Sequence, residues 1–190
     1  MRTVGILAFQ GDFEKHAHMI ETIGARARLV RTMDDVEGVD AIILPGGEST
    51  TIGKLMDAFG VLDPLRDRIV NGLATFGTCA GLILLAPHVE EKNQHRLGVL
   101  DIEVKRNAYG RQVDSFEADI DVPVIGSKPV RGVFIRAPQV VEVSDGVEVL
   151  ARFEGQPVLL RKDRILAASF HPELTADTRI HEYFLTHVCS

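Results

Sequence analysis

Hydrophobic positions in residues 1–90 follow two alternating patterns. Short continuous apolar runs have the length and the β-branched content of buried strands, and they cover residues 3–9, 27–30, 40–44 and 73–76. Between these runs, apolar residues recur every three or four positions, which is the spacing of an amphipathic helix. Strands that alternate with helices predict a parallel sheet with helices on both of its faces.

The ends and buried faces of the helices follow from the same pattern. Asp12 is placed to cap the first helix and Gly24 to end it. The hydroxyl groups of Ser49, Thr50 and Thr51 are expected to cap the second helix. The first three helices are expected to bury these residues: Phe13, Ala17 and Ile20; Ile52, Leu55, Met56 and Phe59; Leu62, Leu65 and Ile69.

The second half of the chain has a different pattern. Short strand-like runs separated by turn residues cover residues 99–105, 115–121, 132–135, 147–153, 157–161 and 165–170. A closing helix over residues 178–188 is expected to pack Ile180, Phe184 and Val188. No repeat or Pro/Ser-rich linker divides the chain. We therefore predict one α/β domain over residues 1–190, with an open, mixed, mostly parallel sheet flanked by helices and some antiparallel later strands.

Composition narrows the class of protein. A net charge of -6 and a pI of about 5.6 argue against nucleic acid as the main partner, because a duplex binder needs a basic face. No run approaches the roughly 20 apolar residues that span a bilayer, and the N-terminal run is read as a strand rather than a signal peptide. The two cysteines, Cys79 and Cys189, do not make a disulfide framework, so a reducing, cytoplasmic location is expected.

The segment Gly77-Thr78-Cys79-Ala80-Gly81 joins a predicted buried strand to a short apolar helix. This spacing is the cysteine version of a nucleophile elbow, in which a tight turn crowds the backbone and favours glycine on both sides. The turn places Cys79 at a helix N-terminus, which stabilises a thiolate, and the N–H of Ala80 is placed to bind an oxyanion. The alternative for this segment alone is a buried structural cysteine.

A second candidate segment is Ser169-Phe170-His171-Pro172-Glu173. Proline favours an extended conformation before it, and side chains two residues apart on an extended chain project from the same side. Glu173 is then able to accept a hydrogen bond from one ring nitrogen of His171, which leaves the other nitrogen for the proton of Cys79. Taken alone, the segment also fits a strand-end histidine beside an exposed glutamate.

A third candidate is the loop Pro45-Gly46-Gly47-Glu48-Ser49-Thr50-Thr51, between a predicted strand and a helix. Glycines at this place allow backbone N–H groups to face a ligand, although the segment lacks the Lys-Ser/Thr ending of a phosphate loop. It also fits an ordinary strand–helix turn. Ligands bind beyond the carboxyl ends of parallel strands, so we expect the diglycine and Cys79 to face one cleft.

Together these segments resemble the triad-type (class I) glutamine amidotransferase domains, and more closely the glutaminase subunits of pyridoxal 5'-phosphate synthases. The matching stretches extend over almost the whole chain: residues 7–12, 44–51, 76–83, 106–116, 133–138 and 169–175. The elbow and the His-Pro-Glu segment are shared by many amidotransferases. The Gly-Glu-Ser-Thr-Thr, Arg-Asn-x-x-Gly-Arg-Gln and Phe-Ile-Arg-Ala-Pro stretches are specific to the subfamily, and no motif position departs from it.

The resemblance implies a flavodoxin-like fold and a role for each matching residue. Cys79 attacks the side-chain amide of glutamine and forms a γ-glutamyl thioester, His171 transfers protons and Glu173 holds His171. Gly47 and Ala80 are implied as oxyanion donors. The residues implied to surround bound glutamine are Gly47, Glu48, Ser49, Arg106, Ile135 and Arg136. Arginine suits the substrate α-carboxylate, because its planar fork forms two parallel hydrogen bonds.

The resemblance also implies a partner. Glutaminases of this kind deliver ammonia to a synthase subunit that builds pyridoxal 5'-phosphate from a pentose phosphate and a triose phosphate. A hetero-oligomeric complex is therefore expected, with weak activity in the free glutaminase chain. No cofactor, nucleic acid or membrane partner is expected. A metal site is not expected either, because the histidines do not pair with the cysteines, and His16 and His18 are poorly spaced for one helical face.

Two rival functions remain. A cysteine peptidase or related hydrolase on the same scaffold typically has histidine directly after the elbow cysteine, whereas Ala80 stands there. A non-catalytic regulatory module is expected to have lost a residue of the triad, and all three are present.

Overall fold

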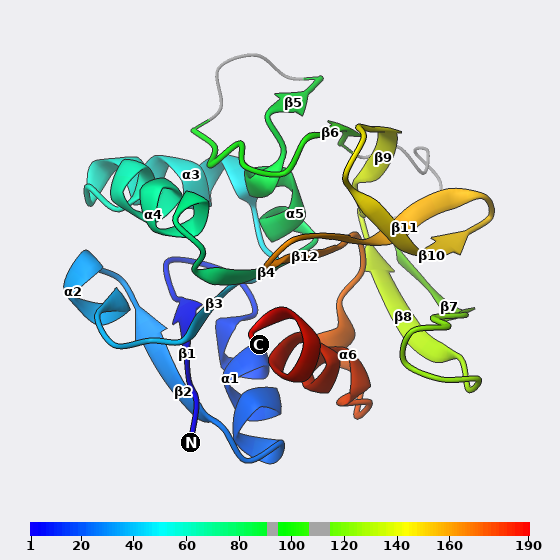
Figure 1. Cartoon of the computed structure of the whole chain (residues 1–190). Helices are drawn as coiled ribbons and strands as arrows, with labels where there is room; N and C mark the ends of the chain where they lie inside the picture. The colour runs from blue at the N-terminus through cyan, green and yellow to red at the C-terminus, as the bar shows by residue number, and fades with distance from the viewer. Residues whose placement is uncertain (91–94, 107–114) are drawn as a thin grey trace.

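A seven-stranded sheet runs through the centre of the molecule, and Figure 1 shows it between two layers of helices. The computed structural model describes residues 1–90, 95–106 and 115–190. The strand order is β10-β11-β12-β4-β3-β1-β2. The bounds of these strands are β1 Thr3–Leu7, β2 Arg26–Val30, β3 Ala41–Leu44, β4 Ala74–Thr78, β10 Glu148–Phe153, β11 Gln156–Lys162 and β12 Ile165–Ala168.

The pairing of these strands confirms the expected mixed, mostly parallel sheet. Strands β2, β1, β3, β4 and β12 pair in parallel, and β11 and β10 complete the sheet in antiparallel pairing. The strand that precedes Cys79, β4, lies in the middle of the sheet. Its carboxyl end and that of its parallel neighbours therefore open on the same edge.

Helices cover both faces of the sheet. Figure 1 shows α3, α4 and α5 on one face and α1 and α6 on the other. The bounds of the helices are α1 Phe13–Thr22, α2 Met33–Val36, α3 Ser49–Ala58, α4 Leu62–Val70, α5 Ala80–Leu85 and α6 Arg179–Tyr183. The closing helix continues as a π-helical turn, Phe184–Val188, which buries Phe184 and Val188 as the sequence pattern predicts.

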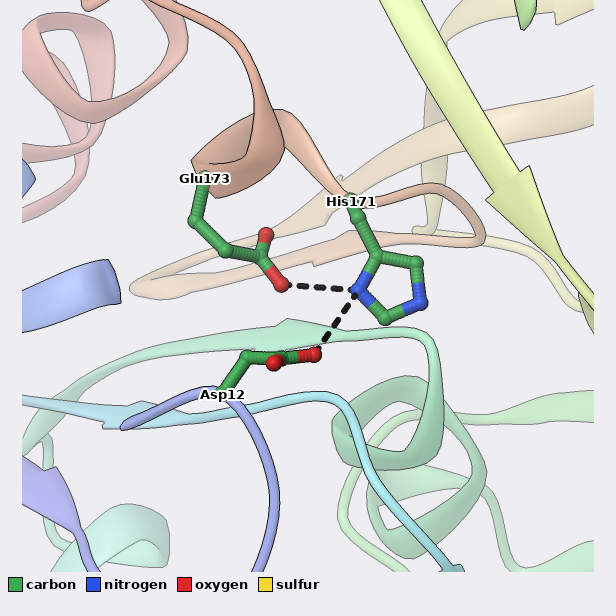
Figure 2. Close-up of side chains that lie close together, drawn as sticks. All are labelled: Asp12, His171 and Glu173. Carbon is green, nitrogen blue, oxygen red and sulfur yellow. Dashed lines mark hydrogen bonds and ion pairs between the residues drawn. The ribbon is translucent and has the colours of Figure 1, made fainter. Parts of the chain in front are cut away.

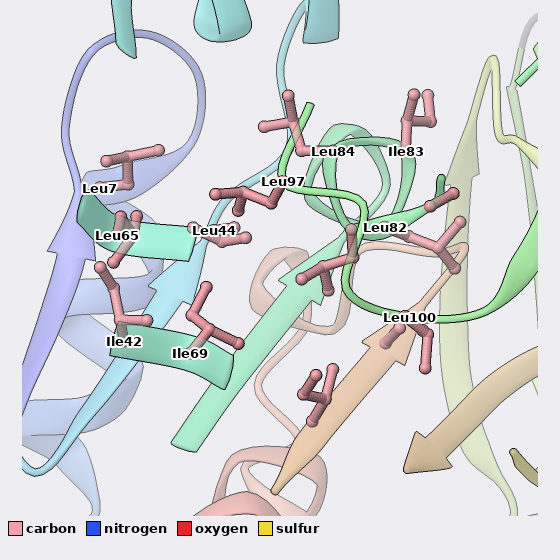
Figure 3. Packing of buried hydrophobic residues seen from close by; sticks show 14 of the residues in the cluster. Leu7, Ile42, Leu44, Leu65, Ile69, Leu82, Ile83, Leu84, Leu97 and Leu100 are labelled. Carbon is pink, nitrogen blue, oxygen red and sulfur yellow. The ribbon is translucent and has the colours of Figure 1, made fainter. Parts of the chain in front are cut away.

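The apolar core forms one cluster on each face of the sheet. Residues of β3 alternate between them: Ile42 and Leu44 belong to the cluster under α4 and α5, whereas Ala41 and Ile43 belong to the cluster under α1 and α6. Figure 3 shows the first cluster, in which side chains of the sheet meet those of α4 and α5. Each large side chain buried in this way contributes about 1.5–3 kcal/mol, and together they make the sheet a rigid support for the loops at its edge.

Two small sheets flank the central one. The first pairs β5 (His88–Val89), β6 (Ile102–Lys105) and β9 (Gln139–Val143), and the second pairs β7 (Ser115–Ile120) with β8 (Val130–Ile135). The sequence pattern did not predict β5 or β9. Strand β5 has only two residues, and β9 buries only one of its side chains fully, so neither has a strong hydrophobic pattern.

Three expectations about the helices are wrong. The N-terminus of α3 is capped by the carboxylate of Glu48, which accepts from the N–H groups of Thr50 and Thr51, and not by the expected hydroxyl groups. The longer side chain of Glu48 reaches both donors from outside the helix. Phe59 is 62% exposed, because α3 ends at Ala58 before its apolar face reaches that residue. Asp12 occupies the predicted N-cap position of α1, but its side chain does not make the capping hydrogen bond.

No helix in the described ranges combines enough length and enough apolar character to cross a bilayer.

Candidate active site

Cys79 lies on a sharp turn between β4 and α5. Its backbone φ is 48°, in the left-handed region that side chains rarely adopt. A methyl group on Gly81 would lie 2.0 Å from the carbonyl oxygen of Leu44, and one on Gly77 would lie 2.7 Å from the backbone of Gly81. Both positions therefore require glycine, for the reason that the spacing of the elbow predicts. The N–H of Cys79 donates to the oxygen of Ala168 at 2.8 Å, which ties the elbow to β12.

His171 reaches the elbow because β12 is the parallel neighbour of β4. Ala168, the last residue of β12, is in register with Thr78, the last residue of β4. Three residues further on, the N–H of His171 donates to the oxygen of Val133 in β8 at 2.8 Å. The chain is thus held on two sides where it presents the His171 ring to Cys79.

Glu173 holds the ring from the interior. Its Oε1 lies 2.7 Å from Nδ1 of His171, and both residues are buried. The expected contact is present, but its local geometry is not the expected one, because Pro172–Leu174 forms a short 3-10 helix and not an extended segment. Proline at the first helical position has a backbone angle that suits such a turn. The hydrogen bond at Nδ1 leaves Nε2 free to exchange a proton with Cys79.

The surroundings of His171 and Glu173 determine the protonation of these two side chains. Burial by itself lowers the pKa of His171, but hydrogen bonds with Cys79 and Glu173 outweigh burial and raise the pKa to about 10. Burial raises the pKa of the Glu173 carboxyl, and the hydrogen bond with His171 opposes that shift. The imidazole therefore carries a proton at neutral pH, beside both the sulfur and the carboxylate.

A second carboxylate faces the same nitrogen from the side of the cleft. Oδ2 of Asp12 lies 3.8 Å from Nδ1 of His171, and its side chain is 43% exposed (Figure 2). Asp12 was predicted as a helix cap, and its contact with His171 was not predicted. Its place directly after the loop that follows β1, on the same sheet edge as Cys79, is the signal that was available.

The ligand atoms of Asp12, His171 and Glu173 lie within 4.8 Å of one another, a spacing that metal sites also show. Two ligands of a tetrahedral ion with bonds of 2.0–2.2 Å stand about 3.3 Å apart. The 2.7 Å contact between His171 and Glu173 is shorter than that. It therefore fits a shared proton better than a shared ion.

The diglycine loop packs directly on the histidine. A methyl group on Gly46 would lie 2.3 Å from Cε1 of His171, so only glycine fits there. Gly47 has a φ of 156°, and a methyl group on it would lie 2.5 Å from Oε1 of Gln10. The same oxygen of Gln10 accepts from the N–H of Glu48 at 2.7 Å. The loop after β1 therefore braces the diglycine loop, and Gln10 lies at the site although it was not among the predicted site residues.

These elements enclose one cleft of about 310 Å³, a volume that suits a small ligand. Of the ten predicted site residues, eight line the cleft; Glu173 lies behind His171, and Ala80 lies next to Cys79 at the start of α5. The residues around the cleft are Gln10, Asp12, Gly47, Glu48, Ser49, Cys79, Ile83, Arg106, Ile135, Arg136 and His171. Residues 107–114 of the subfamily stretch 106–116 lie outside the described residues.

The polar groups of the cleft differ in their pairing. Arg106 contacts a carboxylate oxygen of Glu48 and the hydroxyl of Thr50, each at 3.2 Å. The guanidinium of Arg136 has no hydrogen bond or ion pair with the described part of the chain, and the buried hydroxyl of Ser49 has no hydrogen-bond partner there. Arg136 and Ser49 therefore have bonding capacity for a ligand.

A cysteine elbow, a buried imidazole–carboxylate pair and a diglycine loop at one edge of this sheet define the class of glutamine amidotransferases. A solved glutamine amidotransferase structure agrees, with a TM-score of 0.92 at 53% identity over 96% of each chain. The PurLQS structure from Thermotoga maritima shares the fold alone, with a TM-score of 0.75 at 14% identity over 98% of this chain and 99% of that one.

The chain belongs to the SNO glutamine amidotransferase family, which it matches over residues 6–190. It is 57% identical to the pyridoxal 5'-phosphate synthase subunit PdxT of Desulforudis audaxviator, over 99% of this chain and 100% of the relative. It is 51% identical to the protein of the same name from Carboxydothermus hydrogenoformans, over 98% of this chain and 97% of the relative. The resemblance drawn from the sequence motifs is confirmed.

Proposed function

We propose that this chain is the glutaminase subunit of a pyridoxal 5'-phosphate synthase, with Cys79 as nucleophile, His171 as acid and base, and Glu173 as the group that holds His171. One observation carries the assignment of these residues. The His171 ring lies between the elbow cysteine and a buried carboxylate, with Nδ1 taken by Glu173 and Nε2 left for the sulfur.

The chemistry follows from this arrangement. The sulfur of Cys79 attacks the side-chain carbonyl carbon of glutamine, while His171 holds the proton that left the thiol. His171 then donates this proton to the departing nitrogen, so that ammonia leaves and a γ-glutamyl thioester remains. Next, His171 takes a proton from water, the resulting hydroxide attacks the thioester, and glutamate leaves as the thiol is restored. One glutamine and one water give one glutamate and one ammonia.

The oxyanion formed in each step needs donors, and we assign this role to the N–H groups of Gly47 and Ala80. Ala80 follows the nucleophile at the first turn of α5, where its N–H has no partner within the helix. Gly47 belongs to the loop braced by Gln10. Loss of one oxyanion donor costs on the order of a hundredfold in rate, so a partner that adjusts this loop is able to control turnover.

Substrate recognition is assigned to the groups that line the cleft. We assign the α-carboxylate of glutamine to Arg136, because Arg106 is already paired with Glu48 in the described structure. Glu48, Ser49 and the backbone at Ile135 complete the surroundings.

Arg136→Gln is expected to raise KM for glutamine about tenfold or more with little change in kcat, and Arg106→Gln is expected to raise KM less. Steady-state glutaminase kinetics of both variants test this, and a larger KM effect at Arg106 refutes the assignment.

The partner belongs to the proposal as well. The relatives' names place them in a pyridoxal 5'-phosphate synthase, so we infer a hetero-oligomeric complex in which ammonia passes to the synthase subunit. The free chain is expected to hydrolyse glutamine poorly. Both cysteines are unpaired thiols, which supports a reducing, cytoplasmic setting.

The decisive experiment measures glutamate release with and without the synthase subunit. We expect the synthase to stimulate the wild-type chain, Cys79→Ala to abolish release in both conditions, and Cys189→Ala to behave as wild type. Cys189 is the matched control, since it is also buried but is the next-to-last residue of the chain and does not line the cleft. Partner-dependent release that survives Cys79→Ala refutes the mechanism, and equal wild-type turnover with and without the synthase refutes the partner dependence.

A further inference from the structure

A chain of buried polar groups continues behind the triad, beyond the residues that the mechanism uses. His16 in α1 and His181 in α6 are both fully buried, and Nδ1 of His16 lies 3.0 Å from Nε2 of His181. Nε2 of His16 lies 3.0 Å from the hydroxyl of Thr78 and 3.4 Å from Oε2 of Glu173. The path from Glu173 through His16 to His181 therefore connects the site to α6.

Glu173 needs a partner on this side. Its Oε1 accepts from His171, and Figure 2 shows that its other oxygen points away from that ring. This second oxygen, Oε2, is buried and has no hydrogen-bond partner among the described residues. A buried carboxylate oxygen without compensation costs free energy, and the closest recorded polar contact is the Nε2 of His16.

Both histidines are neutral at physiological pH. Burial lowers the pKa of His181 to about 4, and burial together with the neighbouring histidines lowers the pKa of His16 well below its usual range. Each ring therefore has one N–H and one lone pair. Which nitrogen of His16 bears the hydrogen decides what Glu173 faces.

The geometry favours one arrangement. If Nδ1 of His16 carried the hydrogen, the lone pair at Nε2 would face the carboxylate of Glu173, and the remaining N–H of His181 would point at no acceptor in the described structure. If His181 donates from Nε2 to Nδ1 of His16, the N–H of His16 points toward Thr78 and Glu173. The second arrangement avoids the repulsion and gives the N–H of each of the two histidines an acceptor in the described structure.

We propose that His16 is a positioning residue of the triad, whose N–H at Nε2, oriented by His181, stabilises the ionised carboxylate of Glu173 and thereby the orientation of His171. The groups that face His16 are Thr78 from β4, His181 from α6, and Glu173 beyond β12. The carboxylate of Asp12 contacts the same nitrogen of His171 as Glu173 does, and its negative charge does not compensate Oε2.

The test compares two substitutions of His16 in the complex with the synthase. His16→Leu removes the donor. It is expected to lower kcat about tenfold or more with KM changed less than about twofold. It is also expected to move the acidic limb of the pH profile of kcat/KM to higher pH, because Glu173 without its donor takes up a proton more readily. His16→Gln places an amide N–H near the same oxygen and is expected to recover most of kcat and the original pH profile.

A control separates positioning from packing. Ile20→Val lies on the same helix at a fully buried apolar position, and it is expected to lower Tm while kcat and the pH profile stay unchanged. If His16→Leu lowers Tm and leaves kcat and the pH profile at wild-type values, the proposal is wrong. Failure of His16→Gln to recover activity when it folds also overturns it.

A second variant keeps the test decisive if His16→Leu does not fold. His181→Leu leaves His16 in place but removes the donor to its Nδ1, so a smaller loss of kcat with the same direction of pH shift is expected. An unchanged profile in folded His181→Leu contradicts the proposed orientation of His16. The inference rests on the proposed function, but the two fail differently: activity in Cys79→Ala refutes the function, whereas full activity in His16→Leu refutes only the positioning role.

Discussion

Two carboxylates with contrasting surroundings approach the same nitrogen of His171. On the interior side, Glu173 is buried and lies 2.7 Å from Nδ1; on the side of the cleft, Asp12 is 43% exposed and lies 3.8 Å from the same nitrogen. An interaction between charges weakens with distance and with the solvent between them. The two carboxylates therefore affect His171 to different degrees. Burial and the shorter distance make Glu173 the group that sets the orientation and the charge of the ring.

Replacement of the interior carboxylate is expected to have the largest effect. Glu173→Gln keeps the shape of the side chain but removes its charge, so the protonated ring loses its buried counterion and its fixed tautomer. We expect kcat in the complex to fall on the order of 10³-fold, as in comparable triads, with a small change in KM. Single-turnover measurement of glutamate formation checks this, and a loss below about tenfold contradicts the role of Glu173. Thermal unfolding of the variant shows whether it remains folded.

A smaller effect is expected on the free energy of unfolding at acidic pH, and it comes from the buried histidine His181. The pKa of His181 is lowered to about 4 in the folded chain, whereas an unfolded histidine titrates near 6.5. Between these values the unfolded chain binds a proton that the folded chain does not, so the stabilisation present above pH 6.5 is lost as the pH falls toward 4. For His181 alone the loss is roughly 3 kcal/mol.

Urea unfolding at pH 7 and pH 5 measures the part of this loss that falls above pH 5, about 2 kcal/mol. His181→Leu is expected to flatten the pH dependence, whereas His18→Gln, an exposed substitution on α1, is expected to keep it. His171 has the opposite sign, because its pKa is raised to about 10: its contribution is present below pH 6.5 and is lost as the pH rises toward 10. If the free energy of unfolding depends on pH in the same way in His181→Leu and in wild type, His181 is not the group responsible for the loss.

The carboxylate on the cleft side is expected to matter least. Asp12→Asn keeps the shape of the side chain and removes a solvated charge 3.8 Å from the ring. We expect kcat to change less than about threefold, because exposed charge pairs contribute little. Steady-state kinetics in the complex checks this. A loss in Asp12→Asn as large as that in Glu173→Gln would remove the contrast between the two carboxylates.

The elements and the nucleophile were predictable because their signals are local. The spacing of Gly77, Cys79 and Gly81 predicts the elbow, and the structure shows the backbone contacts that require both glycines. The contact between His171 and Glu173 was predicted with the wrong local geometry, because a turn beginning at Pro172 brings the side chains together as an extended chain also would. Helix capping by Glu48 was missed because hydroxyl residues follow it directly.

The residues that were missed are not marked by a motif. Asp12 looks like a helix cap, and His16 is one of two histidines on a short helix. Their roles depend on where α1 lies against the chain that follows β12, which brings Asp12 to His171 and His16 to Glu173. No periodicity within α1 contains that information.

By itself, the sequence determined the alternating strands and helices, the crowded turn at Cys79 and the family to which the chain belongs. Each of these features depends on residues that are close together in the sequence or on motifs in which every position is present. Only the tertiary structure decided that the carboxyl ends of β4 and β12 lie side by side, so that Cys79 meets a ring 92 positions later in the chain, in register through Thr78 and Ala168. It also decided that the carboxylate of Glu173 is buried and that of Asp12 is partly exposed, because burial depends on how the layers pack and not on any one segment.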